Sequence, residues 1–263
     1  MKFLLLALVF VCVACKGQIE NKVLEDSSSI NDIKNNLMDD NQKNPQIVIR
    51  SLKQLTLKSD IGKSYHFIKK AVSDTKEKIV FNTKNADSVS RVFTNALLYR
   101  IIPFWEGTAW SFDGHTSKPK IGEIACGYFI STTLQDVGVS VNKYKLAQQS
   151  PINEAKSLAI NSDVIEVSKG SVLENINEIK AKLSDGIHFI GFDQNHVGYI
   201  LKEQNRLYLI HSNYIGAKGV EIEEIEKSDV FSSYDKFYLV PISSNPNFLK
   251  NWLENKPINV ITE

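Results

Sequence analysis

Three residues of this 263-residue chain combine the side-chain types and the spacing that nucleophilic catalysis needs. The first is Cys126, which follows a glycine-containing loop and lies at the start of a mostly apolar stretch, Ile124 to Val137, typical of a buried helix. The unpaired N–H groups at a helix N-terminus favour a thiolate, so this position predicts a lowered pKa and a nucleophilic thiol. A single buried cysteine is more often inert, and the prediction therefore depends on the histidines that accompany it.

Two histidines supply a base and a group that orients it. His196 opens one predicted strand and His211 ends the next, with a short hairpin connection around Gln204 and Asn205. Paired strands lie about 5 Å apart, and in this hairpin the two histidines fall within one residue of facing each other. A nucleophilic cysteine needs a base within reach and a third polar group to hold that base. Cys126, His196 and His211 are therefore the predicted catalytic residues.

The elements that must position these residues change character along the chain. Apolar residues at helical spacing come first, and the period then changes to two. Helices are predicted within 49–75 and at 88–101, 124–137, 153–160 and 171–183, and strands at 78–82, 187–192, 196–202, 207–211, 220–225 and 236–240. Helices followed by an antiparallel sheet indicate an α+β fold.

The order of these motifs resembles the NlpC-type cell-wall cysteine peptidases, a branch of the papain-like superfamily. The matching features are the cysteine at a helix start, the strand His-Val-Gly-Tyr-Ile (196–200), and the strand end Ile-His-Ser (210–212). The upstream segment Gly-Thr-Ala-Trp (107–110), followed by Gly114, is similar to the family's Gly-Thr-Pro-Tyr segment and its downstream glycine. The resemblance covers about residues 86–242.

The resemblance implies a papain-like catalytic domain, with the cysteine helix packed on an antiparallel sheet that carries both histidines. It implies Cys126 as nucleophile, His196 as base and acid, and His211 as the orienting residue. The expected reaction is cleavage of peptide or amide bonds, foremost in peptidoglycan stem peptides, through a thioacyl-enzyme. No metal and no other cofactor is expected.

Three further residues are expected at the site. Trp105 and Trp110 form a wall for stacking a sugar or peptide, or alternatively cap the core. Asn213 is either a substrate contact or an alternative to His211 as the orienting group.

Three acidic residues follow on the next predicted strand. Glu221, Glu223 and Glu224 have the spacing of a solvated strand face.

Two alternative functions remain open. Ala125 and Gly127 flank the cysteine where the family usually has Asp and Ser, which leaves room for a papain-like acyltransferase or lipid-amide hydrolase. A catalytically retired, papain-like binding lipoprotein is the other alternative. The complete Cys-His-His set favours an enzyme over a retired fold.

The N-terminal sequence predicts a signal for export from the cytoplasm. After Lys2, Phe3 to Ala14 is an apolar run of twelve residues, too short to span a bilayer, which needs roughly 20. Its end, Cys-Val-Ala-Cys (12–15), resembles a bacterial lipoprotein signal in which Cys15 is lipidated; an ordinary secretory signal is the alternative. The polar segment 16–48 has no aromatic residue and is predicted to be a flexible tether.

The resulting expectation is a protein of the bacterial cell envelope, lipid-anchored to a membrane. The predicted order is a signal peptide (1–15), the tether, a helical extension (49–85), the catalytic domain and a C-terminal tail (243–263). Lys plus Arg number 31 and Asp plus Glu number 30, a balance that gives no electrostatic case for a nucleic-acid partner. Three cysteines are too few for a disulfide scaffold.

Overall fold

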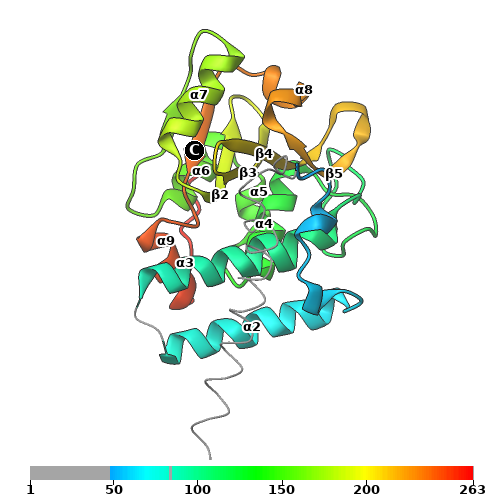
Figure 1. Ribbon diagram of the computed structural model, residues 1–263, viewed down its shortest axis with the longest axis vertical. Coiled ribbons are helices and arrows are strands. Elements are labelled where there is room, and N and C mark those ends of the chain that lie inside the picture. The colour runs from blue at the N-terminus through cyan, green and yellow to red at the C-terminus, as the bar shows by residue number, and fades with distance from the viewer. Residues whose placement is uncertain (1–47, 83–84, 263) are drawn as a thin grey trace, which may run out of the picture. The chain divides into compact units, whose positions relative to one another are not determined.

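A single antiparallel sheet organises the part of the chain that the structure describes. The computed structural model describes residues 48–82 and 85–262, and 48–263 form one compact unit. The predicted signal peptide, its Cys15 and almost all of the tether lie outside the described residues. The six strands have the order β1-β6-β2-β3-β4-β5: β1 (Ile165–Val167), β2 (Gly186–Phe192), β3 (His196–Glu203), β4 (Arg206–Asn213), β5 (Gly219–Glu224) and β6 (Phe237–Val240) (Figure 1).

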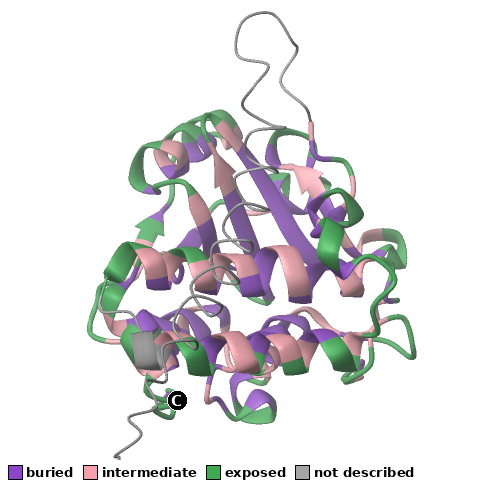
Figure 2. Ribbon diagram, turned by 60° about the horizontal axis from the view of Figure 1, so that its bottom comes forward, coloured by how far each residue is buried: buried purple, intermediate pink, exposed green. Residues whose placement is uncertain are grey.

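Helices cover both faces of this sheet. The α-helices are α2 (Tyr65–Asn82), α3 (Ala86–Thr94), α4 (Cys126–Asp136), α5 (Lys143–Ala147), α6 (Pro151–Ala159), α7 (Val172–Lys182), α8 (Asp229–Ser232) and α9 (Pro246–Leu253). A π-helical segment, η3 (Asn95–Ile101), extends α3, and short 3-10 turns are η1 (Leu52–Leu55), η2 (Lys58–Asp60), η4 (Ile102–Trp105), η5 (Ile215–Ala217) and η6 (Ile225–Lys227). One apolar cluster joins one sheet face to α2, α3, α4, α6 and α9, and a second joins the other face to α7 and α8. The strands are buried along most of their length (Figure 2).

The alternation of side chains along β3 decides which face carries the histidines. Val197 and Tyr199 belong to the cluster under α4, and the Tyr199 hydroxyl lies 2.8 Å from Thr133 Oγ1 of that helix. Ile200 belongs to the cluster under α7 and α8. Because successive strand residues point to opposite faces, His196 lies on the same face as Ile200.

The α+β class predicted from the sequence is confirmed. Helices formed at 88–101, 124–137, 153–160 and 171–183, and strands formed at the five expected positions from 187 onward, to within a few residues.

The strand predicted at 78–82 is wrong, because these residues continue α2. Ile68, Val72 and Ile79 of α2 all pack on the same core, at a spacing that fits one helix face. A short apolar run does not by itself distinguish a strand from a helix.

The segment 243–263 is predicted to be a tail, but α9 within it packs on the core. Asn245 accepts hydrogen bonds from the first N–H groups of α9, and Pro246 occupies the first turn. Trp252 is buried, donates its Nε1–H to Val137 O at 2.9 Å, and lies 5.2 Å from the ring of Phe93. The C-terminal helix is therefore part of the same unit.

Across the described ranges, no helix has both the length and the hydropathy of a membrane span.

Candidate active site

The loop before Cys126 is fastened to the edge of the sheet. Gly107 N–H donates to Val220 O, and Val220 N–H donates to Thr108 O, so the loop pairs with the start of β5. A side chain at Gly219, where φ is +82°, would place its Cβ 2.2 Å from Thr108 O. Ser212 Oγ on β4 donates to Ile124 O at 2.7 Å. These contacts fix where α4 begins.

Cys126 is the first residue of α4 and lies beside the start of β3. Its Sγ is 3.8 Å from Asn195 O, and the N–H of Val197 faces the sulfur. The pairing of β3 with β4 ends at Tyr199 and Ile210. The thiol therefore lies beyond the last β3–β4 pair. It is next to the backbone of Asn195 and Val197, the two residues that flank His196.

Burial raises the pKa of the Cys126 thiol to about 11. The N–H groups of Val197 and Gly127 oppose this shift, and the nearby Glu154 adds to it. The sequence predicted a lowered pKa at the helix N-terminus, and this direction is wrong. Desolvation of the sulfur between α4 and the sheet outweighs the N–H groups of the helix start.

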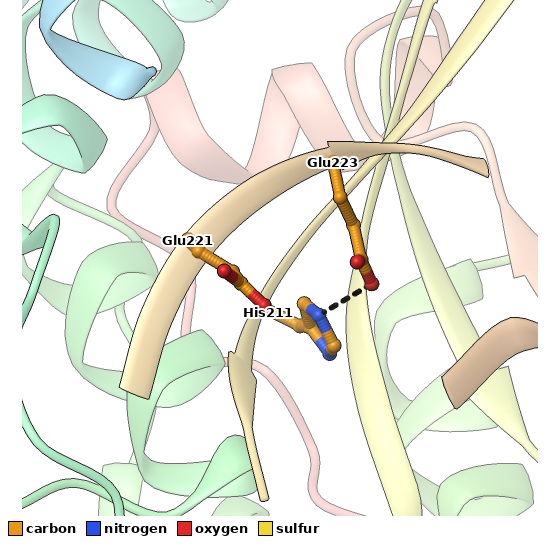
Figure 3. A group of neighbouring side chains, drawn as sticks. All are labelled: His211, Glu221 and Glu223. Atoms are coloured by element: carbon orange, nitrogen blue, oxygen red, sulfur yellow. Dashed lines mark hydrogen bonds and ion pairs between the residues drawn. The ribbon is translucent and has the colours of Figure 1, made fainter. Parts of the chain in front are cut away.

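The two histidines form a hydrogen-bonded chain with a glutamate. His196 Nε2 lies 2.9 Å from His211 Nδ1. His211 Nε2 lies 3.1 Å from Glu223 Oε1 (Figure 3). Ser228 Oγ donates to the same Glu223 oxygen at 2.5 Å. His196 is 1% exposed and His211 is fully buried, so both imidazoles are shielded from water, whereas Glu223 at the outer end is partly exposed.

Strand register brings the two imidazoles together across a glycine. One position beyond the last β3–β4 pair, Tyr199 with Ile210, His211 lies beside Gly198, on the same face as His196 and two residues from facing it, not within one as the sequence predicted. A Cβ at Gly198 would lie 3.2 Å from His211 Cβ and 3.1 Å from Ile210 O. The glycine of the His-Val-Gly sequence therefore eases packing against His211, because a larger residue would force its neighbours to shift by a few tenths of an ångström.

The acceptor at the end of the chain sets the tautomers of both rings. Burial favours a raised pKa for Glu223, but hydrogen bonds from His211 and Ser228 outweigh it, and the pKa is lowered. Glu223 is thus a carboxylate that only accepts, so the neutral form of His211 carries its proton on Nε2 and accepts at Nδ1. His196 then carries its proton on Nε2. Its Nδ1 is left with a free lone pair, the form a general base needs.

Burial lowers the pKa of His196 well below its usual value, and His211 adds to this shift. The resting site therefore pairs a thiol with a neutral imidazole. Where the structure describes both residues, no hydrogen bond joins Cys126 Sγ to His196. The catalytic roles of Cys126, His196 and His211 remain predictions.

Aromatic rings border the histidines. The Tyr214 ring lies 5.2 Å from that of His196, and the Trp110 ring lies 6.2 Å from Tyr214. Tyr234 donates to Asn195 Oδ1 at 2.9 Å and its hydroxyl lies 3.3 Å from that of Tyr214. Trp110 is partly exposed, and its role as a stacking wall for substrate remains a prediction.

Two residues expected at the site have structural roles. Trp105 is fully buried in the core and donates its Nε1–H to Tyr65 Oη at 2.9 Å, which corrects its assignment to a substrate wall. Asn213 is 1% exposed. Its Nδ2 donates to Glu221 and its Oδ1 accepts from Ile215 N–H. Both ends of the amide are therefore used in hydrogen bonds within the fold.

Glu223 was missed, because a solvated face was predicted for 221–224. The signal that identifies it is register. Glu221 lies opposite His211, and Glu223 is the next residue on that face. His211, Glu221 and Glu223 also form a group with metal-ligating atoms, all within 4.8 Å of one another.

Comparison of the chain with known proteins found no matching family model, no matching curated protein and no matching solved structure.

Proposed function

We propose that this chain is a cysteine hydrolase of the bacterial cell envelope that cleaves peptide or amide bonds, with peptidoglycan stem peptides as the first candidate substrate. The observation that carries the proposal is the row of hydrogen-bonded side chains His196, His211 and Glu223, close to a cysteine at a helix start. Hydrogen bonds fix the tautomer of the base in the direction that catalysis requires. A papain-like fold, with α4 packed on a sheet that carries both histidines, is part of this proposal.

The proposed reaction starts from a thiol and a neutral imidazole. As Cys126 Sγ attacks the carbonyl carbon, its proton passes to His196 Nδ1, and the N–H of Cys126 stabilises the oxyanion. The imidazolium of His196 donates through Nε2 to His211, whose Nε2–H donates to the Glu223 carboxylate. His196 then gives its proton to the leaving amine.

Deacylation reverses these roles. A water molecule loses a proton to His196 Nδ1 and attacks the thioester carbon, which releases the carboxylic acid. Sulfur takes the proton back from His196. Atoms and charge balance over the cycle: one amide bond and one water give one amine and one acid.

One observation favours the retired binding protein as a second candidate. The raised pKa of Cys126 and the lack of a hydrogen bond from its sulfur to His196, two residues within the described ranges, match an inert thiol. Against this, hydrogen bonds between catalytic groups are often loose before substrate binds.

The test uses the full chain, purified in detergent, and purified peptidoglycan. Released fragments are identified by mass spectrometry and compared with those from Cys126→Ser. Fragments that vanish in the variant support the hydrolase, and their masses identify the bond. If wild type and variant release the same fragments, or none, from both peptidoglycan and a panel of model amides, the hydrolase proposal fails.

The envelope location is proposed from the sequence alone. Mass spectrometry of the N-terminal peptide from bacterial membranes is expected to show lipid on Cys15. The Cys15→Ala variant is expected to leave the membrane fraction. An unmodified N-terminal peptide would support the secreted alternative.

A further inference from the structure

The outer end of the histidine chain has the composition of a metal site. His211 on β4 and Glu221 and Glu223 on β5 place one imidazole nitrogen and two carboxylate oxygens within 4.8 Å of one another (Figure 3). His211 and Glu221 are direct cross-strand partners, and Glu223 follows on the same face. Strand pairing thus holds three ligating groups on one rigid surface.

An ion can reach this group from outside. Strand β5 is the edge of the sheet within the described chain. Glu221 has 30% of its side chain exposed and Glu223 has 16%, whereas the His211 side chain is fully buried. The imidazole is therefore the buried ligand, and the two carboxylates are the ligands that solvent reaches.

We propose that His211, Glu221 and Glu223 bind Zn²⁺. One imidazole and two carboxylates suit zinc, which takes such ligands at about 2.0–2.2 Å. Binding draws the ligating atoms inward from their present separations, and water completes a four-coordinate ion.

Neighbouring groups already orient the two carboxylates. Asn213 Nδ2 donates to Glu221 at 2.5 Å, and Ser228 Oγ donates to Glu223 at 2.5 Å. Such outer contacts hold a ligand's second oxygen or lone pair and leave the remaining ones for the metal. Lys218 Nζ lies 3.9 Å from Glu221 and opposes a cation, so its removal is expected to tighten binding.

Zinc at this position reverses the tautomers of the chain. A metal on His211 Nε2 displaces the proton of that atom to Nδ1, because a neutral imidazole keeps one proton. His211 Nδ1–H then donates to His196 Nε2, and the His196 proton moves to Nδ1. His196 Nδ1 loses the lone pair that accepts the thiol proton. Zinc is thus an inhibitor of the proposed reaction, and this second step rests on the proposed function.

Calorimetry with ZnCl₂ tests the site without any activity. The titration uses the full chain in detergent with Cys12→Ser, Cys15→Ser and Cys126→Ser, so that no thiol competes for the metal. Adding Glu221→Gln is expected to weaken binding at least tenfold, whereas Lys218→Met is expected to tighten it. Circular dichroism checks that each variant is folded. Equal affinity with and without Glu221→Gln would overturn the site.

Nitrogen NMR of ¹⁵N-histidine-labelled protein tests the tautomer change. Zinc is expected to move the His196 proton from Nε2 to Nδ1, and Glu221→Gln is expected to need at least tenfold more zinc. Zinc binding with an unchanged His196 tautomer would overturn the switch. These readouts do not depend on hydrolysis, so a failed peptidoglycan assay leaves both results decisive. If hydrolysis occurs, zinc is expected to suppress it, with greater resistance in Glu221→Gln.

Discussion

The pH dependence of Cys126 alkylation separates two resting states of the site. A thiolate–imidazolium pair reacts at a nearly constant rate across neutral pH, whereas a partly buried thiol with a raised pKa reacts through a small thiolate fraction. With a pKa of about 11, roughly one sulfur in a thousand is ionised at pH 8. A free cysteine with a pKa of about 8.5 is about one-quarter ionised, a ratio of roughly 250.

The higher pKa also makes the thiolate more nucleophilic. With a Brønsted coefficient of about 0.45 and a pKa difference of about 2.5, the Cys126 thiolate is roughly 13-fold more reactive than the thiolate of a free cysteine. Cys126 is therefore expected to react about 20-fold more slowly than a free cysteine at pH 8. Its rate is expected to rise tenfold per pH unit up to about pH 11.

The assay follows iodoacetamide labelling of the Cys126 peptide by mass spectrometry, with protein unfolded in guanidinium as the reference. His196→Ala serves as the control and is expected to change the rate less than threefold, because the neutral imidazole does not hold a thiolate. A plateau between pH 5 and 8 that disappears in His196→Ala would refute this account, since only an ion pair produces it.

Three further results follow from the contacts described. Glu223→Gln replaces a charged acceptor by a neutral one and is expected to lower the hydrolysis rate about 5- to 30-fold, a loss of about 1–2 kcal/mol of transition-state stabilisation. The control Glu224→Gln, on the opposite face of the strand, is expected to have little effect on this rate. Gly198→Ala is expected to lower the free energy of unfolding by about 1–3 kcal/mol, measured in urea, because its Cβ lacks space beside His211. Burial lowers the pKa of His188 to about 4, below its usual value of about 6.5, so the unfolded chain binds the proton first. Unfolding free energy is expected to fall by about 3 kcal/mol as pH drops from 6.5 to 4, less steeply in His188→Gln.

Each of these has a contradicting outcome. Equal rates for Glu223→Gln and Glu224→Gln would remove the glutamate from the chain. An unchanged unfolding midpoint in Gly198→Ala would show that the strands have more room than the register implies. Parallel pH profiles for wild type and His188→Gln would assign acid sensitivity to other groups.

The sequence predicted the parts of the site that depend on local pattern. The helix from Ile124 to Val137 follows from an apolar stretch ended by glycine, and α4 occupies it. The contact between His196 and His211 follows from a short hairpin, because two strands joined by a tight turn have few possible registers.

The rest depends on pairings that no local pattern determines. The link from His211 to Glu223 requires the register of β4 with β5, whose connection is longer and irregular. The three-residue strand β1, which pairs with β6 from far along the chain, has no periodic signal of its own. The direction of the Cys126 pKa depends on how deeply α4 packs on the sheet, which is a property of the whole fold.

The position of the sulfur at the end of the β3–β4 ladder makes the proposed nucleophile part of the scaffold. Val197 N–H has no β4 partner among the described pairs and faces Cys126 Sγ instead. Cys126→Ala leaves that buried N–H without an acceptor, at a cost on the order of 1 kcal/mol, whereas Cys126→Ser retains an acceptor atom. Loss of the thiol therefore weakens the fold as well as the chemistry, and a lineage that abandoned catalysis would still be under pressure to keep a hydrogen-bond acceptor at residue 126.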